Sequence, residues 1–365
     1  MLMRSSPRCL IGATVGRHTL PVSGMVAASH NLVVAHRRMV LDSSQVPSAP
    51  TKVAALQEKP HGPARTWVKR LLGRFHVTGV FWYRWSWRVS KGPDWFLAGM
   101  VYVHTWFFWL VLRGIRDAVA SNLEAVLGPC SWLERQRRIW RTFHDFAWCH
   151  TERYEQFRPE KDMHFDFAGT ETYEKMIATK RGCVFYTAHF GNWEMGPITE
   201  RLPGGRKFHI VREPEMSQPA QELVQMLFEK HPQRDQFVVH YAGAEMTLGA
   251  RLLMALRNGD VVGMPGDRPR AGMETITAQM FGKPMELPPG PVALARAANA
   301  MMVPVFVFRE GRRRYRVELW PPYDVPNTDD KEADIAAGVA AMSAACETAI
   351  RRRPYHWFCW KKLWP

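Results

Sequence analysis

The second half of the chain alternates between short apolar runs and amphipathic stretches. Apolar runs of strand length lie at 183–188, 207–212, 236–240, 260–265, 302–308 and 314–320. Helical spacing of apolar residues marks 192–201, 217–230, 244–257, 290–300 and 330–352. Strands that alternate with helices are typical of an α/β fold with a mostly parallel sheet flanked by helices. We predict this architecture from about residue 160 onward.

One further helix is predicted just before this region. Ser131 and Glu134 have the spacing of a capping box, in which the two side chains satisfy backbone groups at a helix start. Leu133, Trp140 and Phe143 then follow at helical spacing. The pattern predicts a helix from residue 132 to about 155 with its apolar face in the core.

A longer apolar stretch runs from Trp95 to Leu112 and is interrupted only by His104 and Thr105. At ~1.5 Å per residue it would reach about 27 Å, slightly less than the hydrocarbon core of a bilayer. Three structures fit this length: a marginal spanning helix, a helix in the membrane interface, and a buried core helix. The preceding segment, residues 59–91, is basic and aromatic, which favours membrane contact and would place that segment on the cytoplasmic side of a spanning helix.

Residues 1–60 carry little globular signal. They contain arginines but no acidic residue before Asp42, a composition found in organellar transit peptides. We favour the simpler alternatives, a disordered tail or a reading frame extended upstream of the true start. We divide the chain into this N-terminal extension, a basic-aromatic segment with the hydrophobic helix at 61–115, and the main folded domain at 116–365.

Composition narrows the classes of function. Hydrophobic residues make up 46% of the chain, and the net charge of +15 predicts attraction to an anionic partner such as a nucleic acid, a membrane surface or an acidic protein. The sequence contains no RRM, KH or helix-turn-helix signature, so we expect no nucleic-acid partner. Its six cysteines form no C-x-x-C pair and its histidines lack ligand spacing, so no metal is expected.

The strongest candidate for chemistry is the segment from His189 to Glu194. It follows the apolar run at 183–188 and turns through Gly191 and Asn192. An imidazole after such a strand lies at the carboxyl edge of the sheet, where α/β proteins place their sites. We expect Glu194 to fold back and orient His189 as a general base. The alternative is a histidine at a helix start with a glutamate that neutralises the helix dipole.

With other landmarks, this His-x4-Glu pattern resembles the membrane acyltransferases that acylate glycerolipids, and within them the lipid A late acyltransferases (the lauroyl and myristoyl transferases). The landmarks that occur in the family's order are Asn122-Leu123, residues 134–138, residues 210–214, residues 266–268, residues 281–283 and residues 289–295. The likeness covers about residues 95–362. Mycobacterial acyltransferases of phosphatidylinositol mannosides share the same landmarks.

The resemblance implies a glycerolipid acyltransferase-like fold, with residues 116–365 as the acyltransferase domain. It implies transfer of a fatty acyl chain from acyl carrier protein, or from acyl-CoA, to a hydroxyl of a membrane glycolipid such as a lipid A precursor, without a cofactor. The expected place is the bacterial inner membrane, with the active site on the cytoplasmic side. Other acceptors remain open: a lysophospholipid, a phosphatidylinositol mannoside or an ornithine lipid. A non-catalytic nucleic-acid or membrane adaptor is the alternative that charge alone suggests.

The resemblance also assigns roles beyond His189 and Glu194. Arg212 is expected to bind substrate phosphate, or else to pair with Glu213 or Glu215. Asp267 is expected to orient Arg212 or the acceptor, or else to be a turn residue. The remaining substrate-binding candidates are Asn192, whose main chain with that of Gly191 is a candidate oxyanion donor, and Gly282 and Gly290 of the channel lining.

The chain ends in an aromatic and basic cluster at 355–364. Its composition predicts a second surface in contact with the bilayer, and core packing is the alternative.

Overall fold

The computed structural model describes residues 80–364 except 159, 199–201, 203–204, 216–217, 230, 232–233, 244–246 and 271. The described residues belong to one structural unit, Glu58–Pro365. The predicted N-terminal extension and most of the predicted basic-aromatic segment therefore lie outside the described residues.

A mixed sheet forms the centre of the described fold, in the strand order β1-β9-β8-β2-β5-β3-β4 with β10 paired to β8. The strands are β1 (His164–Ala168), β2 (Cys183–Thr187), β3 (Phe208–Arg212), β4 (Phe237–Tyr241), β5 (Val261–Pro265), β8 (Met301–Gly311), β9 (Arg314–Leu319) and β10 (Tyr323–Asp324). From β8 to β4 neighbouring strands are parallel, whereas β9 is antiparallel to β8. The predicted mostly parallel sheet is confirmed.

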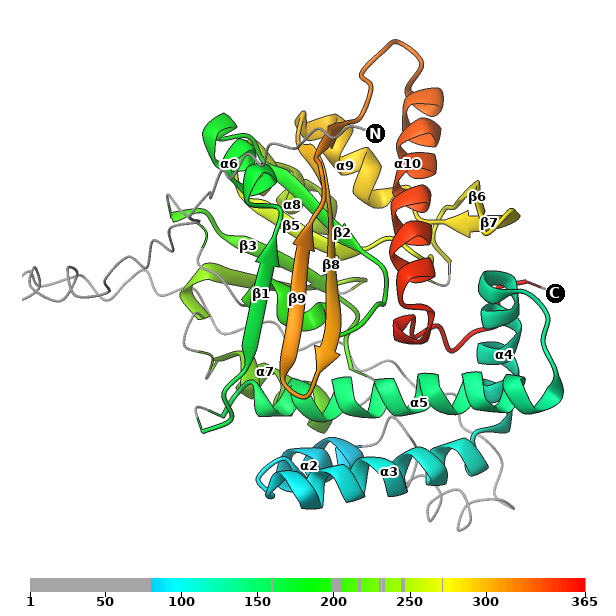
Figure 1. Cartoon of the computed structure of the whole chain (residues 1–365). Coiled ribbons are helices and arrows are strands. Elements are labelled where there is room, and N and C mark those ends of the chain that lie inside the picture. The colour runs from blue at the N-terminus through cyan, green and yellow to red at the C-terminus, as the bar shows by residue number, and fades with distance from the viewer. Residues whose placement is uncertain are drawn as a thin grey trace, which may run out of the picture. The chain divides into compact units, whose positions relative to one another are not determined.

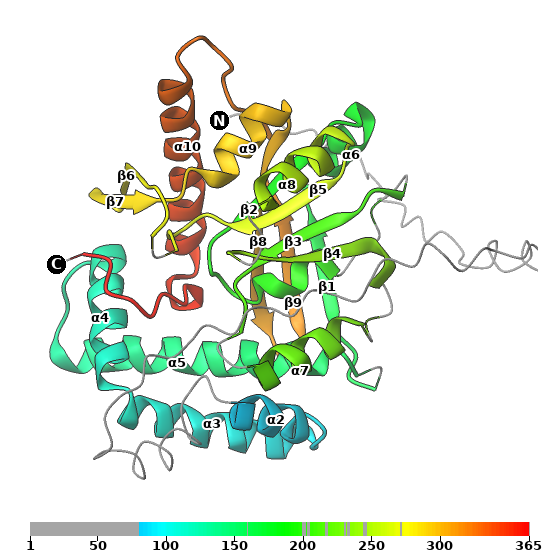
Figure 2. The same ribbon diagram turned by 180° about the vertical axis from the view of Figure 1, so that it is seen from behind.

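Helices cover this sheet and extend beyond one end of it (Figures 1 and 2). They are α2 (Val80–Val89), α3 (Asp94–Val111), α4 (Arg113–Leu127), α5 (Trp132–Glu155), α6 (Thr170–Thr179), α7 (Gln218–Glu229), α8 (Leu248–Arg257), α9 (Gly290–Ala298) and α10 (Lys331–Arg352). A two-stranded hairpin of β6 (Ile276–Met280) and β7 (Lys283–Leu287) packs on α10.

Residue alternation along the strands divides the core into two layers. On one face Val184 and Tyr186 of β2 pack with Leu256 of α8 and Met342 of α10. On the other face Cys183 and its strand neighbours pack with Met176 of α6. Because successive side chains of a strand point to opposite faces, each central strand contributes to both layers. This double burial explains why these strands read as continuous apolar runs.

The predicted and observed elements agree closely in the central sheet and at α5. Ser131 caps α5 by accepting a hydrogen bond from the backbone N–H of Glu134, as the capping box predicts. The helix predicted at 192–201 is wrong in type: residues Trp193–Ile198 form a 3-10 helix. Pro197 within this segment lacks the N–H that a regular helix needs. The sequence analysis did not predict β1, α6 or the β6–β7 hairpin.

The apolar stretch at 95–112 forms α3 and ends where α4 begins, with a bend of 96° between the two helices. Among the described helices α10 alone is long and apolar enough to cross a membrane by itself, and half of its apolar window is buried in the fold. Helix α3 buries Leu97 and Val101 but exposes a row of large apolar side chains. The exposed members are Trp95, Phe96, Tyr102, Val103, Trp106, Phe107, Leu110 and Val111.

Candidate active site

His189 lies just beyond the carboxyl end of β2, where the chain turns sharply. The turn is fixed from two sides: the carbonyl of His189 accepts a hydrogen bond from the backbone N–H of Phe358, and the N–H of Gly191 donates to the carbonyl of His356. Gly191 has φ +57°, and a Cβ there would lie 2.0 Å from the carbonyl oxygen of Val307. Only glycine fits this turn. The sequence thus places the imidazole rigidly at the sheet edge.

Asp267 is the hydrogen-bond partner of that imidazole. It follows β5, which neighbours β2, and the N–H of Gly266 donates to the carbonyl of Thr187. The Asp267 side chain is fully buried, and its Oδ1 lies 2.6 Å from Nδ1 of His189. Its Oδ2 accepts a hydrogen bond of 3.0 Å from Nε1 of Trp357. Both carboxylate oxygens therefore have a donor.

The electrostatics of this pair keep the carboxylate charged. Burial alone would raise the pKa of Asp267, but the charges of His189 and Arg268 and the two hydrogen bonds outweigh burial and hold the pKa well below its usual range. A carboxylate can only accept, so Nδ1 of His189 carries the proton. In the neutral form of the ring, Nε2 is then left with a lone pair that can take a proton from a substrate.

Glu194 does not orient His189, and this part of the sequence prediction is wrong. Its carboxylate instead lies 2.6 Å from Nε of Arg153 and 3.9 Å from Nη2 of Arg212. Burial alone would raise the pKa of Glu194, but the two arginines and His189 together lower it. Two guanidinium groups, which are always charged, attract a carboxylate more strongly than one imidazole does. The 3-10 helix that begins at Trp193 directs Glu194 toward these arginines.

Arg212 ends β3 at the same sheet edge as His189, as predicted, but its guanidinium already has acidic partners. Nη2 lies 2.6 Å from Glu215, and only 8% of the Arg212 side chain is exposed. The ion pair with Glu215, which the sequence left open as an alternative, is therefore present. The contact of Arg212 with substrate stays a prediction.

Asn192 anchors the turn to the protein interior. Its side-chain amide donates to the backbone carbonyl of Cys149, at 3.0 Å, and to the hydroxyl of Tyr315, at 3.1 Å. Only 5% of Asn192 is exposed. Both N–H groups of the side chain are thus used within the protein, and the substrate-binding role of Asn192, through its main chain, stays a prediction.

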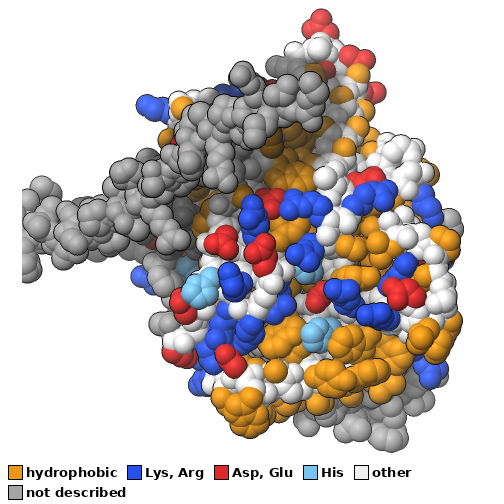
Figure 3. Space-filling model, in the orientation of Figure 1, with side chains coloured by type: hydrophobic (Ala, Val, Ile, Leu, Met, Phe, Trp, Pro, Cys, Tyr) orange, Lys and Arg blue, Asp and Glu red, His pale blue; other side chains and the backbone are white. Residues whose placement is uncertain are grey.

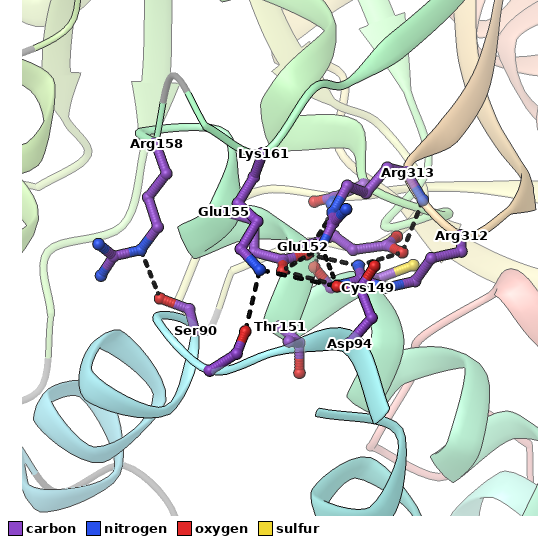
Figure 4. Close-up of polar contacts among 12 residues, drawn as sticks. Ser90, Asp94, Cys149, Thr151, Glu152, Glu155, Arg158, Lys161, Arg312 and Arg313 are labelled. Carbon is purple, nitrogen blue, oxygen red and sulfur yellow. Dashed lines mark hydrogen bonds and ion pairs between the residues drawn. The ribbon is translucent and has the colours of Figure 1, made fainter. Parts of the chain in front are cut away.

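The Tyr315 hydroxyl connects Asn192 to a buried ionic cluster. Figure 4 shows Glu152 and Glu155 of this cluster with Arg312 and Arg313. The Tyr315 hydroxyl donates to Glu152 of α5, whose carboxylate is fully buried and also binds Arg309, with Nε and Nη2 at 2.8 and 3.1 Å. Glu155, one turn further along α5, is also fully buried and binds Arg312 at 2.6 Å. Burial alone would raise the pKa of Glu152, but Arg309 and the other donors lower it.

The same ionic cluster reaches the start of α3. Arg312 and Arg313 both contact Asp94, the first residue of that helix, as well as Glu155. Lys161 adds a contact of 3.6 Å to Asp94. Two fully buried carboxylates are thus matched by several cations, the arrangement that buried charges require. The cluster joins α3, α5 and the β8–β9 hairpin behind the His189 turn.

The remaining predicted site residues are Gly191, which lies in the His189 turn, and Gly282 and Gly290, which do not line the cavity. Gly191 cannot supply an oxyanion donor because its N–H is bound to His356. Gly282 has φ +73° and is exposed in the turn of the β6–β7 hairpin, whereas its neighbour in that turn, Phe281, is buried. Gly290 begins α9, with open space beside it. In the described structure, neither Gly282 nor Gly290 lines the cavity that lies next to His189; their channel role stays a prediction.

The C-terminal aromatic cluster is part of the core, which corrects the prediction of a bilayer-contacting surface. Trp357, Phe358 and Trp364 are each at most 6% exposed. Trp357 packs against Phe281 and donates to Asp267, so core packing, the alternative, is correct. Sequence reasoning missed the role of Trp357, since nothing in the local pattern distinguishes it from the other tryptophans of the cluster.

An apolar cavity of about 330 Å³ lies beside the His189 turn, on the sheet face that α6 covers. Its lining includes Thr187, two residues before His189, and Trp193, whose ring centroid lies 5.4 Å from that of the imidazole. The other walls come from β1, β2, β3, β5, β8, β9, α6 and the loop residue Leu202. They are formed by Phe167, Tyr173, Phe185, Leu202, Phe208, Ile210, Gly263, Val305, Val307, Val317 and Leu319, with their neighbours.

The arrangement defines a class of protein: an α/β fold whose histidine, oriented by a buried aspartate, stands beside an apolar cavity. It suits base-assisted chemistry on a molecule with a hydrocarbon chain. Residues 84–365 match the family of bacterial lipid A biosynthesis acyltransferases, and the chain belongs to that family. The protein is therefore an acyltransferase, and the resemblance drawn from its motifs is confirmed.

Individual relatives are distant. The chain is 25% identical over 264 residues to the phosphatidylinositol mannoside acyltransferase of two Mycobacterium tuberculosis strains, an alignment that covers 69% of this chain and 78% of the relative. Among solved structures, the 1-acyl-sn-glycerophosphate acyltransferase of Thermotoga maritima has a TM-score of 0.33 and 11% identity, over 70% of this chain and 97% of that one. A score this low supports no argument about site or substrate.

Proposed function

We propose that this protein transfers a fatty acyl group from a thioester to a hydroxyl group of a membrane glycolipid, such as a lipid A precursor. Acyl carrier protein or coenzyme A carries the chain, and no cofactor takes part. The observation that carries the proposal is the hydrogen bond of His189 to the buried carboxylate of Asp267, placed beside an apolar cavity.

The chemistry follows from the protonation states of this pair. Nε2 of His189 removes the proton of the acceptor hydroxyl. At the same time the hydroxyl oxygen attacks the carbonyl carbon of the thioester, and a C–O bond forms. Asp267 stabilises the imidazolium through Nδ1–H. When the tetrahedral intermediate collapses, the C–S bond breaks and the imidazolium returns its proton to the leaving thiolate. The products are an ester and a free thiol, and no protein nucleophile is needed because the thioester is already activated.

The cavity beside His189 suits the hydrocarbon chain of the donor. Apolar residues dominate its lining, and burying a methylene group contributes about 0.8 kcal/mol. A chain that enters past Trp193 would leave its carbonyl carbon near the imidazole. Specific acyl binding and the placement of the reacting carbon therefore come from the same feature.

Helix α3 suits contact with the membrane that holds the acceptor. Its exposed apolar row gathers along one edge of the molecule (Figure 3). The flanking residues Arg84, Arg88, Lys91 and Arg113 are exposed and basic, as expected for contact with lipid phosphates. With a 96° bend at its end, α3 fits a helix that lies in the interface better than one that spans the bilayer. The proposed place is the cytoplasmic face of the bacterial inner membrane.

The identity of the acceptor has a second candidate. The family points to lipid A precursors, whereas the mycobacterial relatives are named for phosphatidylinositol mannosides. Both acceptors are membrane glycolipids with free hydroxyls, so one site chemistry serves either. Lysophospholipid and ornithine lipid remain further alternatives for the same reaction.

The direct test uses the purified full-length protein in detergent micelles, with radiolabelled acyl carrier protein and acyl-CoA as donors and each candidate acceptor in turn. We expect transfer to one glycolipid class, and we expect His189→Ala to lower the rate roughly 10²–10⁴-fold while the fold stays intact. Mass spectrometry of lipids from cells with and without the protein would identify the acceptor by its missing acyl chain. Full activity of His189→Ala would overturn the role of His189 as the base, whereas no acyl transfer by the wild-type protein would favour an adaptor role.

A further inference from the structure

A glycine stands in the wall of the cavity at a place where the backbone does not require one. Gly263 is the central residue of β5 and has no positive φ. Glycine weakens a strand interior, so its presence there often marks a close approach of another group. A Cβ at residue 263 would lie 2.5 Å from Cε1 and 2.7 Å from Cζ of Phe208. The Phe208 ring thus occupies the space that a side chain at 263 would need.

Phe208 and Gly263 lie far from His189 along the strand direction. In the sheet register Gly263 is opposite Phe185, four residues before His189, which corresponds to about 13 Å at ~3.3 Å per residue. Phe208 of β3 is paired with Val261 of β5, which lies two residues further than Gly263 from the sheet edge that carries His189. Among the cavity-lining residues of β2, β3 and β5, none lies further from that edge than Phe208.

Packed side chains leave no further space next to Phe208 and Gly263 on the side away from His189. Phe208 is only 5% exposed, and its ring meets that of Phe185 edge-on with centroids 5.6 Å apart. Below them Cys183 and Val261 are fully buried in the same core cluster. Interiors packed this densely accept an added methylene group only by displacing side chains. The Phe208 ring over Gly263 is therefore a firm end to the cavity.

We propose that Gly263 and Phe208 together set the length of the fatty acyl chain that the enzyme transfers. The inference rests on the proposed function and deepens it by naming the residues that select the donor. The chain extends from the carbonyl carbon near His189 down along β2 and β5, and its terminal methyl group lies over Gly263 against the Phe208 ring. A side chain at 263 would push that ring into the cavity and shorten it, whereas a smaller residue at 208 would deepen it.

The test is a competition among acyl thioesters of increasing even chain length, from octanoyl to stearoyl, with products separated by mass spectrometry. We expect Gly263→Ala to shift the preferred donor to a chain shorter by roughly two carbons, since one added methyl group displaces the ring. We expect Phe208→Leu to shift it to a chain longer by roughly two carbons, because the cavity deepens. The double variant should return toward the wild-type preference, because the smaller side chain at 208 accommodates the new methyl group.

Gly249→Ala is the matched control, since space is open beside Gly249 on α8 and this residue does not line the cavity, so it should leave the preference unchanged. An unchanged preference in active Gly263→Ala and Phe208→Leu would overturn the inference while the proposed function stands. If wild-type protein transfers no acyl chain at all, the proposed function fails instead. Displacement of a fluorescent fatty acid by chains of graded length then tests the cavity by itself. Should Gly263→Ala not fold, Phe208→Leu decides the question alone.

Discussion

The Nδ1 atom of His189 lies 2.6 Å from Oδ1 of Asp267, although 78 positions separate the two residues in the chain. Parallel pairing of β2 with β5 brings them together, because both residues follow the carboxyl ends of neighbouring strands. The acid of the His-x4-Glu pattern, Glu194, is committed to Arg153 and Arg212. Asp267 is therefore the carboxylate that orients the imidazole.

Substitution of the two acids should separate their roles. We expect Asp267→Asn to lower kcat roughly 10²–10⁴-fold with little change in KM, because Nδ1 loses its charged acceptor and the imidazolium its stabilising charge. The loss of kcat in Glu194→Gln should be at least tenfold smaller than the loss in Asp267→Asn, because Glu194→Gln leaves the hydrogen bond between His189 and Asp267 intact. Steady-state kinetics gives kcat and KM of both variants, and circular dichroism is the control for folding. A larger kcat loss in Glu194→Gln than in Asp267→Asn would refute this assignment.

The hydroxyl of Tyr315 should support catalysis through Asn192 rather than by touching substrate. Tyr315→Phe removes the link between Asn192 and Glu152, and we expect kcat to fall roughly tenfold, with unfolding free energy lowered by about 1–2 kcal/mol. A double-mutant cycle with Asn192→Ala measures the coupling, and the double variant should lose less than the product of the two single effects. Fully independent effects, or a change confined to KM, would instead indicate direct substrate contact.

Membrane binding should depend on the exposed face of α3. Val103 and Leu110 are 58% and 60% exposed, so replacing both with Asp removes apolar burial and adds charge. Burial of one such side chain contributes about 1.5–3 kcal/mol, so we expect affinity for anionic phospholipid vesicles to fall at least tenfold. Met254→Asp is the control, because Met254 is 55% exposed but lies on α8. Vesicle sedimentation measures all three proteins, and equal binding would contradict the role of α3.

Two histidines, the buried His356 and the partly buried His150, should make stability fall in mild acid. Burial lowers the pKa of both His150 and His356 to about 4. The unfolded chain, with a histidine pKa of about 6.5, then binds protons that the folded chain does not, so stability is fully present above about pH 6.5 and declines toward about pH 4. At about 1.4 kcal/mol per pH unit, each histidine accounts for a loss on the order of 3 kcal/mol.

Urea unfolding followed by tryptophan fluorescence across this pH range measures the decline. In His356→Gln the decline should be about half as steep, because one of the two titrating groups is gone. A flat profile for the wild-type protein between about pH 6.5 and about pH 4 would show that these histidines do not titrate as inferred.

The sequence by itself determined the central sheet, α5 and the position of His189. Each of these depends on local signals: apolar runs for strands buried on both faces, a capping box at Ser131, and a Gly-Asn turn after β2. The edge strand β1 escaped prediction because its residues are half-exposed and lack a continuous apolar run. The sequence also predicted the acyltransferase family, through motifs in a fixed order.

Only the tertiary structure decided which carboxylate orients the imidazole of His189 and which side chain closes the end of the cavity. Spacing along the chain favoured Glu194, but charge attraction acts through space, where two arginines stand nearer to that carboxylate. Trp357 joins Asp267 across 90 positions, and Phe208 lies over Gly263 because β3 and β5 are neighbours. Such contacts depend on strand order, which the pattern of apolar and polar residues does not encode.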